Sequence, residues 1–258
     1  LIDLLHTLKT LDKSRLEIFY PRVRDRNDIK VLRDNLTEVI VLSKSDHINL
    51  EYYQGREETD SVKVNELNIK STKLNDNKRR VKEFGNYIRN KKWLDFGCGN
   101  GGMLDEISFE ALQSYGLEPN LARRKYTISK GHKVFQNLDE INDKSLDIIT
   151  LFHVFEHLQD PIEILKILKN KLKLNGKILI EIPHARDSLF TIYDCEEFKK
   201  FTFWSEHLVL HTKESIQTVL ECSGFSKIKI YNYQRYNLAN HLHWLSKGRP
   251  GGQEVGNY

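Results

Sequence analysis

Cysteine is scarce in this sequence, and its spacing forms no pairs. Cys98, Cys195 and Cys222 are the only three in 258 residues, and no Cys-x-x-Cys motif occurs. A disulfide scaffold and a zinc ribbon are therefore excluded, because both need closely spaced cysteine pairs. Few, unpaired cysteines are typical of a reducing compartment, so we expect a cytoplasmic protein.

Long hydrophobic runs and a dominant charge sign are also lacking. The uncharged apolar stretches fall far short of the roughly 20 residues that a membrane helix needs, so we expect no membrane span. Lys and Arg number 40 against 36 Asp and Glu, and the net charge of +4 is spread along the chain. Without a basic patch we expect no nucleic-acid partner. The 39% hydrophobic and 10% aromatic content predicts a folded core.

Short apolar runs alternate with amphipathic stretches from Trp93 onward, which is typical of βα units and a parallel sheet. Residues 1–85 are more polar and predict a small N-terminal extension. Its polar segment 71–80 indicates a linker or an exposed helix start. Expected strands are 39–42, 92–96, 114–117, 133–135, 146–151, 177–182, 228–233 and 242–245, and expected helices are 102–112, 121–129, 161–174 and 213–222.

A glycine-rich turn follows the strand at 92–96. Gly97, Gly99 and Gly102 between a strand and a helix let the backbone turn tightly and approach a ligand closely. This frame alone also fits a dinucleotide site. Asp95, two positions before the first glycine, suits an amino group and disfavours a pyrophosphate. Glu118, after the next strand, can accept hydrogen bonds from both hydroxyls of a ribose.

The run D-F-G-C-G-N-G at 95–101, with G-L-E-P at 116–119 and F-H-V-F-E-H-L-x-D-P at 152–161, resembles the class I methyltransferases that use S-adenosylmethionine. The resemblance covers about residues 85–245. It implies an α/β, Rossmann-like domain over 86–258, with a seven-stranded sheet of order 3-2-1-4-5-7-6 and strand 7 antiparallel. It also implies S-adenosylmethionine as the methyl donor and S-adenosylhomocysteine as its product.

The same resemblance implies the residues that hold the donor. Gly97 and Gly99 would line its methionine part, Asp95 would support that part, and Glu118 would hold the ribose. Asn137 and Leu138 would lie beside the adenine, and Phe152 and His153 beside the sulfonium. The full implied set is Asp95, Gly97, Cys98, Gly99, Glu118, Pro119, Asn137, Leu138, Phe152 and His153.

Methyl transfer to carbon or oxygen also needs a base, and histidine is best matched to neutral pH. The fold that the resemblance implies builds its acceptor site in the insertion at about 184–212. His207 with Glu206 is our candidate for acceptor activation. His184 is the alternative, because it follows the fifth strand at the edge where open α/β sheets bind ligands. We expect His157 to shape the pocket floor.

The stretch from I-P-H-A-R-D at 182–187 to E-H-L-x-L-H-T-x-E-S-I at 206–216 resembles a subgroup of sugar and polysaccharide-biosynthesis methyltransferases. In its sugar C-methyltransferases a Glu-His pair in this frame performs acid–base chemistry, often with a tyrosine two residues before the Glu. Trp204 occupies that position here. Those enzymes carry an N-terminal zinc ribbon, whereas this chain has no cysteine before Cys98. We therefore expect no metal site and a degenerate, zinc-free ribbon plus a helix in residues 1–85.

The acceptor that this resemblance implies is a sugar, a nucleotide sugar or a glycan precursor. The alternative is an O- or C-methyltransferase of a small phenolic or quinone-like metabolite, whose pocket would be mostly apolar rather than polar beside an aromatic platform. A catalytically silent binding domain and a nicotinamide dehydrogenase also remain open. The sequence does not determine the oligomeric state.

Overall fold

The computed structural model describes residues 1–55 and 66–251, which form two compact units. The parallel-sheet unit contains residues 47–155 and 163–181, and the antiparallel-sheet unit contains residues 1–46, 156–162 and the chain from Ile182 onward. Each unit thus contains segments that are distant in sequence. The predicted division into residues 1–85 and 86–258 stays a prediction.

Five parallel strands form the sheet of the first unit. Their order, β6-β5-β4-β7-β8, corresponds to the first five positions of the predicted order, 3-2-1-4-5. Each predicted strand between residues 92 and 182 is present, within a few residues. The strands are β4 (Lys92–Phe96), β5 (Gln113–Leu117), β6 (Val134–Phe135), β7 (Leu146–Phe152) and β8 (Leu172–Glu181).

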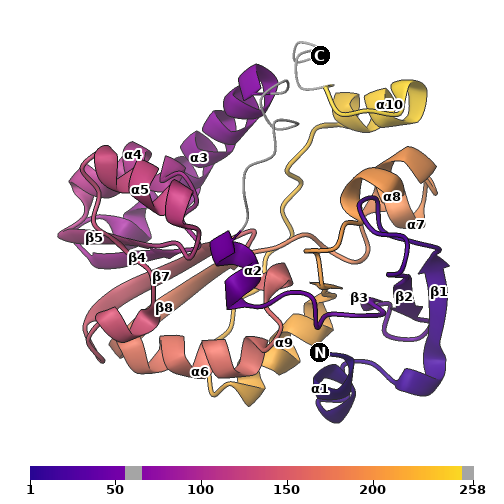
Figure 1. The fold of residues 1–258 in the computed structure, drawn as a ribbon, viewed down its shortest axis with the longest axis horizontal. Coiled ribbons are helices and arrows are strands. Elements are labelled where there is room, and N and C mark those ends of the chain that lie inside the picture. The colour runs from indigo at the N-terminus through magenta and orange to yellow at the C-terminus, as the bar shows by residue number, and fades with distance from the viewer. Residues whose placement is uncertain (56–65, 252–258) are drawn as a thin grey trace. The chain divides into compact units, whose positions relative to one another are not determined.

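Helices cover both faces of this sheet. Helices α3, α4 and α5 lie on one face and α6 lies on the other (Figure 1). Because α3 includes residues 71–80, that polar segment belongs to a helix and is not a linker. The elements are α2 (Leu50–Gly55), α3 (Glu66–Ile88), α4 (Gly102–Ile107), η3 (Ser108–Glu110), α5 (Leu121–Ser129), η4 (Leu138–Glu140) and α6 (Pro161–Lys171).

The core between α3, α4 and the sheet is apolar. Ile88 of α3, Trp93 of β4 and Ile107 of α4 are fully buried in one cluster. This packing fixes the strand ends from which the glycine turn departs. Strand β8 begins at Leu172, so α6 ends at Lys171, earlier than the predicted helix at 161–174.

The antiparallel-sheet unit joins the N-terminal residues to the insertion. Its strand order is β1-β2-β3-β9, and β3 pairs with β9 through Ile40 opposite Leu210 and Val41 opposite Val209 (Figure 1). The elements are α1 (Ile2–Thr7), η1 (Lys13–Arg15), β1 (Leu16–Tyr20), β2 (Val31–Asp34), β3 (Ile40–Leu42), η5 (Phe155–His157), α7 (Ser188–Thr191), α8 (Glu196–Thr202), β9 (Val209–Leu210), α9 (Lys213–Cys222) and α10 (Leu238–Lys247).

The two late strands that we predicted are wrong. Residues 242–245 lie in α10, which begins where the Asn237 side chain accepts the Asn240 N–H and ends at Gly248 in a left-handed conformation. His241 and Trp244 are buried three positions apart, which is a helical spacing. Residues 228–233 form no strand. The sixth and seventh strands of the predicted sheet are therefore not confirmed in the part of the chain that the structure describes.

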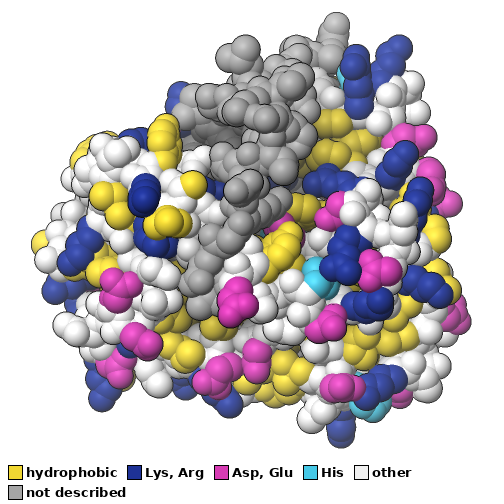
Figure 2. Space-filling model, in the orientation of Figure 1, with side chains coloured by type: hydrophobic (Ala, Val, Ile, Leu, Met, Phe, Trp, Pro, Cys, Tyr) yellow, Lys and Arg dark blue, Asp and Glu magenta, His cyan; other side chains and the backbone are white. Residues whose placement is uncertain are grey.

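No helix within residues 1–55 and 66–251 is both long and apolar enough to cross a bilayer. Figure 2 shows Lys and Arg side chains interleaved with Asp and Glu over the displayed face. This mixed surface agrees with the small net charge of +4.

Candidate active site

The glycine turn between β4 and α4 is fastened to the end of β5. The Gly97 and Cys98 N–H groups both donate to the Leu117 carbonyl, at 2.8 and 3.0 Å. Gly97 and Gly99 have φ values of +75° and +55°, which side chains rarely adopt. A Cβ on Gly97 would lie 2.6 Å from Val154, whereas a Cβ on Gly99 would meet none of the described atoms within 4 Å. Space for a ligand therefore lies on the Gly99 side.

Glu118 links this turn to the start of α5. Glu118 is 5% exposed, and its two carboxylate oxygens accept the Gly99 N–H at 2.9 Å and the Asn120 N–H at 2.8 Å. Arg124 donates to the carbonyls of Glu118 and Pro119, at 2.9 and 3.0 Å. Each carboxylate oxygen has a second lone pair, so Glu118 can accept further hydrogen bonds from a diol.

Asp95 lies beneath the same turn. Its carboxylate is 4% exposed and accepts a 2.8 Å hydrogen bond from Thr150 Oγ1, which itself accepts one from Trp93 Nε1 at 2.9 Å. Burial raises the pKa of Asp95 to about 7, against the opposing effects of Thr150 and the Arg80 charge. A ligand ammonium group would favour the charged form of this carboxyl.

The other residues predicted to hold the donor differ in setting. The Cys98 side chain is part of the apolar core, where burial raises its thiol pKa, and its Sγ lies 3.9 Å from the Gly99 carbonyl oxygen of the turn. Asn137 is exposed and caps η4 in a capping box with Glu140. Leu138 is half-buried in the first turn of η4.

A cluster of charged side chains lies where β7 and β8 end, and of its members the sequence indicated only His153. Glu181 accepts hydrogen bonds from Arg79 at 2.8 Å and Arg80 at 2.6 Å, and lies 3.4 Å from His153 Nε2. Burial would raise the Glu181 pKa, but these three partners hold it well below its ordinary value. The Arg80 guanidinium also lies 4.6 Å from the Phe152 ring centre. The only signal was the Arg-Arg doublet, which resembled a solvent-exposed charge run.

In the antiparallel-sheet unit, the predicted Glu206–His207 pair meets a second Glu-His pair. His157 Nδ1 is 3.7 Å from Glu206 Oε2, and His157 Nε2 is 3.9 Å from Glu156 Oε1. The His157 and His207 rings are 5.1 Å apart. We call these four residues the Glu–His cluster. The repeated E-H-L at 156–158 and 206–208 was a signal that could have indicated it.

An aromatic side chain borders the Glu–His cluster. Trp204 contacts the rings of His207 and His157 edge-on, with centroids 5.4 and 6.0 Å apart. The Arg24 guanidinium lies 4.9 Å from the Trp204 ring centre. The cluster thus combines carboxylates, imidazoles and an aromatic ring.

His184 has different partners from His207. Its Nδ1 accepts the Arg186 N–H at 3.0 Å, and its backbone forms an isolated bridge with His211. Burial, followed by the Arg186 charge, lowers the pKa of His184. A base that already accepts a backbone hydrogen bond is less suited to take a substrate proton at that nitrogen.

The N-terminal segment holds the chain around Glu206 in place. The Ser205 N–H and hydroxyl both donate to the Asp25 carboxylate, at 2.9 and 2.6 Å. The Leu42 N–H donates to the Leu208 carbonyl at 3.0 Å. Residues 1–46 therefore support the predicted acceptor segment, a function that their sequence did not reveal.

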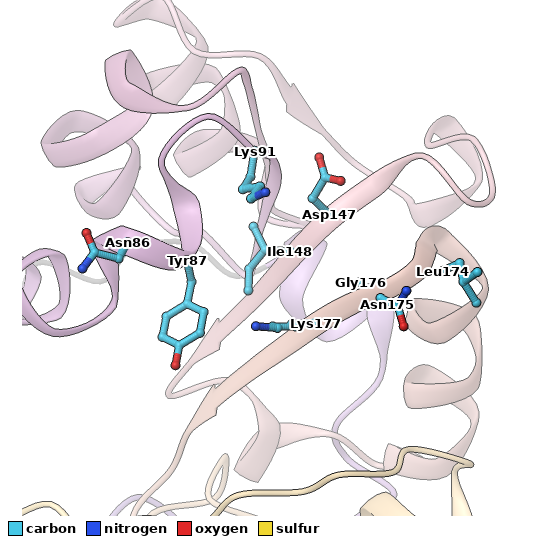
Figure 3. Close-up of a pocket in the computed structure, with 9 residues that line it drawn as sticks. All are labelled: Asn86, Tyr87, Lys91, Asp147, Ile148, Leu174, Asn175, Gly176 and Lys177. Carbon is cyan, nitrogen blue, oxygen red and sulfur yellow. The ribbon is translucent and has the colours of Figure 1, made fainter.

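A cavity of about 310 Å³ opens at the opposite, amino-terminal ends of the parallel strands (Figure 3). Lys91, Asp147 and Lys177 line it, and Lys177 Nζ lies 5.0 Å from the Tyr87 ring centre. Open α/β sheets bind ligands at the carboxyl ends of their strands, so this cavity lies at the wrong edge for the donor.

Comparison with known proteins places these residues in context. The family described as "Methyltransferase domain" matches residues 71–230. The ubiquinone biosynthesis O-methyltransferase of Photobacterium profundum is 26% identical over 122 residues, or 43% of this chain and 52% of that protein. The Vibrio cholerae protein of the same name is 26% identical over 132 residues, or 46% and 54%. The chain therefore spans about half the length of these curated relatives.

A solved structure is similar as well. It is a SAM-dependent methyltransferase from Archaeoglobus fulgidus, with 28% identity and a TM-score of 0.50, covering 60% of this chain and 71% of that chain. The glycine turn, Asp95, Glu118 and the Glu–His cluster all lie within the matched residues 71–230.

Proposed function

This chain belongs to the methyltransferase domain family, which matches more than half of its length, and on that premise we propose that it transfers the methyl group of S-adenosylmethionine to a small organic acceptor. One observation carries the proposal. The glycine turn presents Gly99 to open space directly beside two buried carboxyls, Asp95 and Glu118. A ligand that has both an ammonium group and a ribose diol matches these two acids.

Each acid has a distinct part in the proposed donor site. Glu118 accepts the ribose hydroxyls on the lone pairs that its two backbone hydrogen bonds leave. Asp95 faces the positive end of the methionine part, where an ammonium group favours its ionised form. Arg79 and Arg80 add positive charge beside the ends of β7 and β8 and suit the donor carboxylate.

The Glu–His cluster supplies the acceptor half of the proposed reaction. A lone pair of the acceptor attacks the methyl carbon in line with the carbon–sulfur bond, whose electron pair returns to sulfur. The acceptor then carries a proton that must leave, and the cluster around His207 and Glu206 removes it. S-Adenosylhomocysteine is the co-product.

A hydroxylated acceptor such as a sugar, a nucleotide sugar or a glycan precursor suits this cluster. Two carboxylates and two imidazoles beside the Trp204 ring offer hydrogen bonds together with a stacking surface. A second candidate acceptor is a small phenolic or quinone-like metabolite, and the names of the two curated relatives support it. We place the reaction in the cytoplasm, in keeping with three cysteines that form no disulfide.

Donor binding is the first test. Isothermal titration of the full chain with S-adenosylmethionine and S-adenosylhomocysteine should give one site, and Glu118→Ala should weaken it by roughly tenfold or more. Glu110→Ala, which alters an exposed ion pair with Arg89, is the matched control. If the chain binds neither ligand at millimolar concentration, the proposed activity is wrong and the chain is a catalytically silent domain. Preference for NAD would indicate a dehydrogenase.

Acceptor identity is tested by mass spectrometry. Nucleotide sugars, glycan precursors and phenolic metabolites are incubated with the protein and donor, and the product gains the mass of one methylene group. His207→Ala should lower turnover by roughly a hundredfold with donor affinity unchanged. Unchanged turnover in this variant, together with a loss in His184→Ala, would move the base to His184.

A further inference from the structure

The two Glu-His pairs of the cluster are joined by their backbones as well as by their side chains. The Leu208 N–H donates to the Glu156 carbonyl at 2.9 Å, which brings the end of η5 against the residues that precede β9. One ligand atom each from Glu156, His157 and His207 lies within 4.8 Å of the other two. Carboxylate and imidazole groups at this spacing are the ligand set of many metal sites.

Both imidazoles direct their Nδ1 atoms at oxygen acceptors. His207 Nδ1 is 3.0 Å from the Thr202 carbonyl, so that nitrogen donates and Nε2 carries the lone pair. His157 Nδ1 faces the Glu206 carboxylate at 3.7 Å. Histidines that bind metals almost always direct their second nitrogen to a carbonyl or a carboxylate, which fixes the tautomer and makes the ligand more basic.

The spacing of the ligand atoms leaves room for an ion. His157 Nε2 and Glu156 Oε1 are 3.9 Å apart, which is too long for a hydrogen bond. Ligands of tetrahedral zinc lie about 2.0–2.2 Å from the ion and therefore roughly 3.3 Å from each other. The three ligand atoms lie within 4.8 Å of one another, so around a bound ion they would approach each other by up to about 1.5 Å.

Burial and charge favour a divalent cation in this place. Glu156 is fully buried and Glu206 is 3% exposed, so both carboxylates lie away from bulk water. Carboxylate oxygens are ligands of divalent ions, and the cluster contains two carboxylates. Imidazole ligands favour zinc and neighbouring transition metals over Mg²⁺ and Ca²⁺.

We propose that Glu156, His157 and His207 bind a divalent transition-metal ion, zinc in the first place, and that Glu206 orients His157 through its Nδ1. The sequence predicted no metal site, because no cysteine pair is present and no cysteine precedes Cys98. The ligands come instead from two short motifs that are distant in the chain. Three protein ligands leave a fourth position open for a substrate oxygen.

The catalytic consequence of this site rests on the proposed function. An ion held there would lower the pKa of a bound acceptor hydroxyl, which would then release its proton to water. Its oxygen then forms the new bond to the methyl carbon as the carbon–sulfur bond breaks. His207 would then promote the removal of the acceptor proton through the ion that it holds, which is how the Glu–His cluster of the proposed function would act.

Metal binding by the full chain tests the site without any assay of activity. Protein stripped with a chelator is titrated with Zn²⁺ alone and with Co²⁺ alone, and bound metal is counted by mass spectrometry. We expect one equivalent of metal per chain and visible Co²⁺ bands of a four-coordinate site. His157→Gln and His207→Gln should each weaken binding by roughly a hundredfold, and Glu206→Gln by roughly tenfold. His6→Gln, at an exposed histidine of α1, should leave it unchanged.

Binding of S-adenosylhomocysteine separates this inference from the proposed function. Each variant should still bind it, because the donor residues lie in the parallel-sheet unit. Wild-type protein that takes up less than about a tenth of an equivalent of metal overturns the site. The site is also overturned if the double variant that combines His157→Gln and His207→Gln binds as much metal as the wild type. Metal uptake without donor binding would instead overturn the proposed function and leave the metal site intact.

Discussion

At the scale of single residues, Asp95 makes stability depend on pH. Its carboxyl has a pKa of about 7 in the folded protein, because burial raises it from an ordinary value of 3.8. Between these two values the folded protein retains a proton that the unfolded chain has released. The free energy of unfolding contributed by Asp95 therefore falls as pH rises through this window, by at most about 1.4 kcal/mol per pH unit.

Asp95→Asn removes this titration and retains an oxygen that can accept the Thr150 hydrogen bond. Relative to wild type, the variant should gain stability between pH 5 and pH 8, by on the order of 1 kcal/mol or more. Urea denaturation at both pH values measures the difference. If the free energies of unfolding of wild type and variant change in parallel with pH, the Asp95 carboxyl is not the titrating group.

Gly97 and Gly99 provide a matched pair of residues in the same turn. Both have positive φ, so alanine costs backbone strain of about 1 kcal/mol or more at either position. At Gly97 the added Cβ would also lie 2.6 Å from Val154, whereas at Gly99 it would project into open space. Gly97→Ala should therefore lower the melting temperature more, and Gly99→Ala should mainly abolish S-adenosylhomocysteine binding. Thermal unfolding and titration calorimetry separate the two effects, and normal donor binding by Gly99→Ala would contradict this donor site.

At the scale of elements, the loop between β1 and β2 supports the segment that carries Glu206. Asp25→Ala removes the acceptor of both Ser205 hydrogen bonds, so it should lower the free energy of unfolding by about 1–3 kcal/mol and reduce turnover with donor affinity unchanged. Asp28→Ala is the control, because Asp28 forms only exposed ion pairs with Arg26 and Lys44. Equal effects of the two substitutions on turnover would show that the Ser205 contact does not position the cluster.

The same scale shows where sequence patterns were reliable. The strands β4, β5 and β7 and the helices α5 and α9 lie close to their predicted ranges, because each combines an apolar period with clear turn or capping residues. Residues 242–245 were mistaken for a strand because a short apolar run does not reveal its period. The cap at Asn237 and the buried spacing of His241 and Trp244 determine the helix instead.

At the scale of the whole molecule, neither unit is a continuous stretch of chain. The chain crosses from one unit to the other after residues 46, 155, 162 and 181, and one crossing falls inside α6. We therefore expect one cooperative unfolding transition. S-Adenosylhomocysteine at a hundred times its Kd should stabilise it by about 2.7 kcal/mol. Fluorescence, with Trp93 in one unit and Trp204 in the other, and circular dichroism should report the same midpoint. Two unfolding transitions, of which S-adenosylhomocysteine shifts the midpoint of only one, would contradict this expectation.

The sequence by itself determined the parallel sheet and the glycine turn on which we place the proposed donor site. The glycine turn and the acids Asp95 and Glu118 lie within one short stretch of chain, where local spacing brings them together, whereas the order of the strands was implied by the family resemblance. Only the tertiary structure decided the rest. It paired β3 with β9, brought Arg79 and Arg80 onto Glu181, and joined two distant Glu-His pairs into one cluster. Contacts between residues far apart in the chain depend on packing and burial, and apart from the repeated E-H-L no local period or motif indicated them.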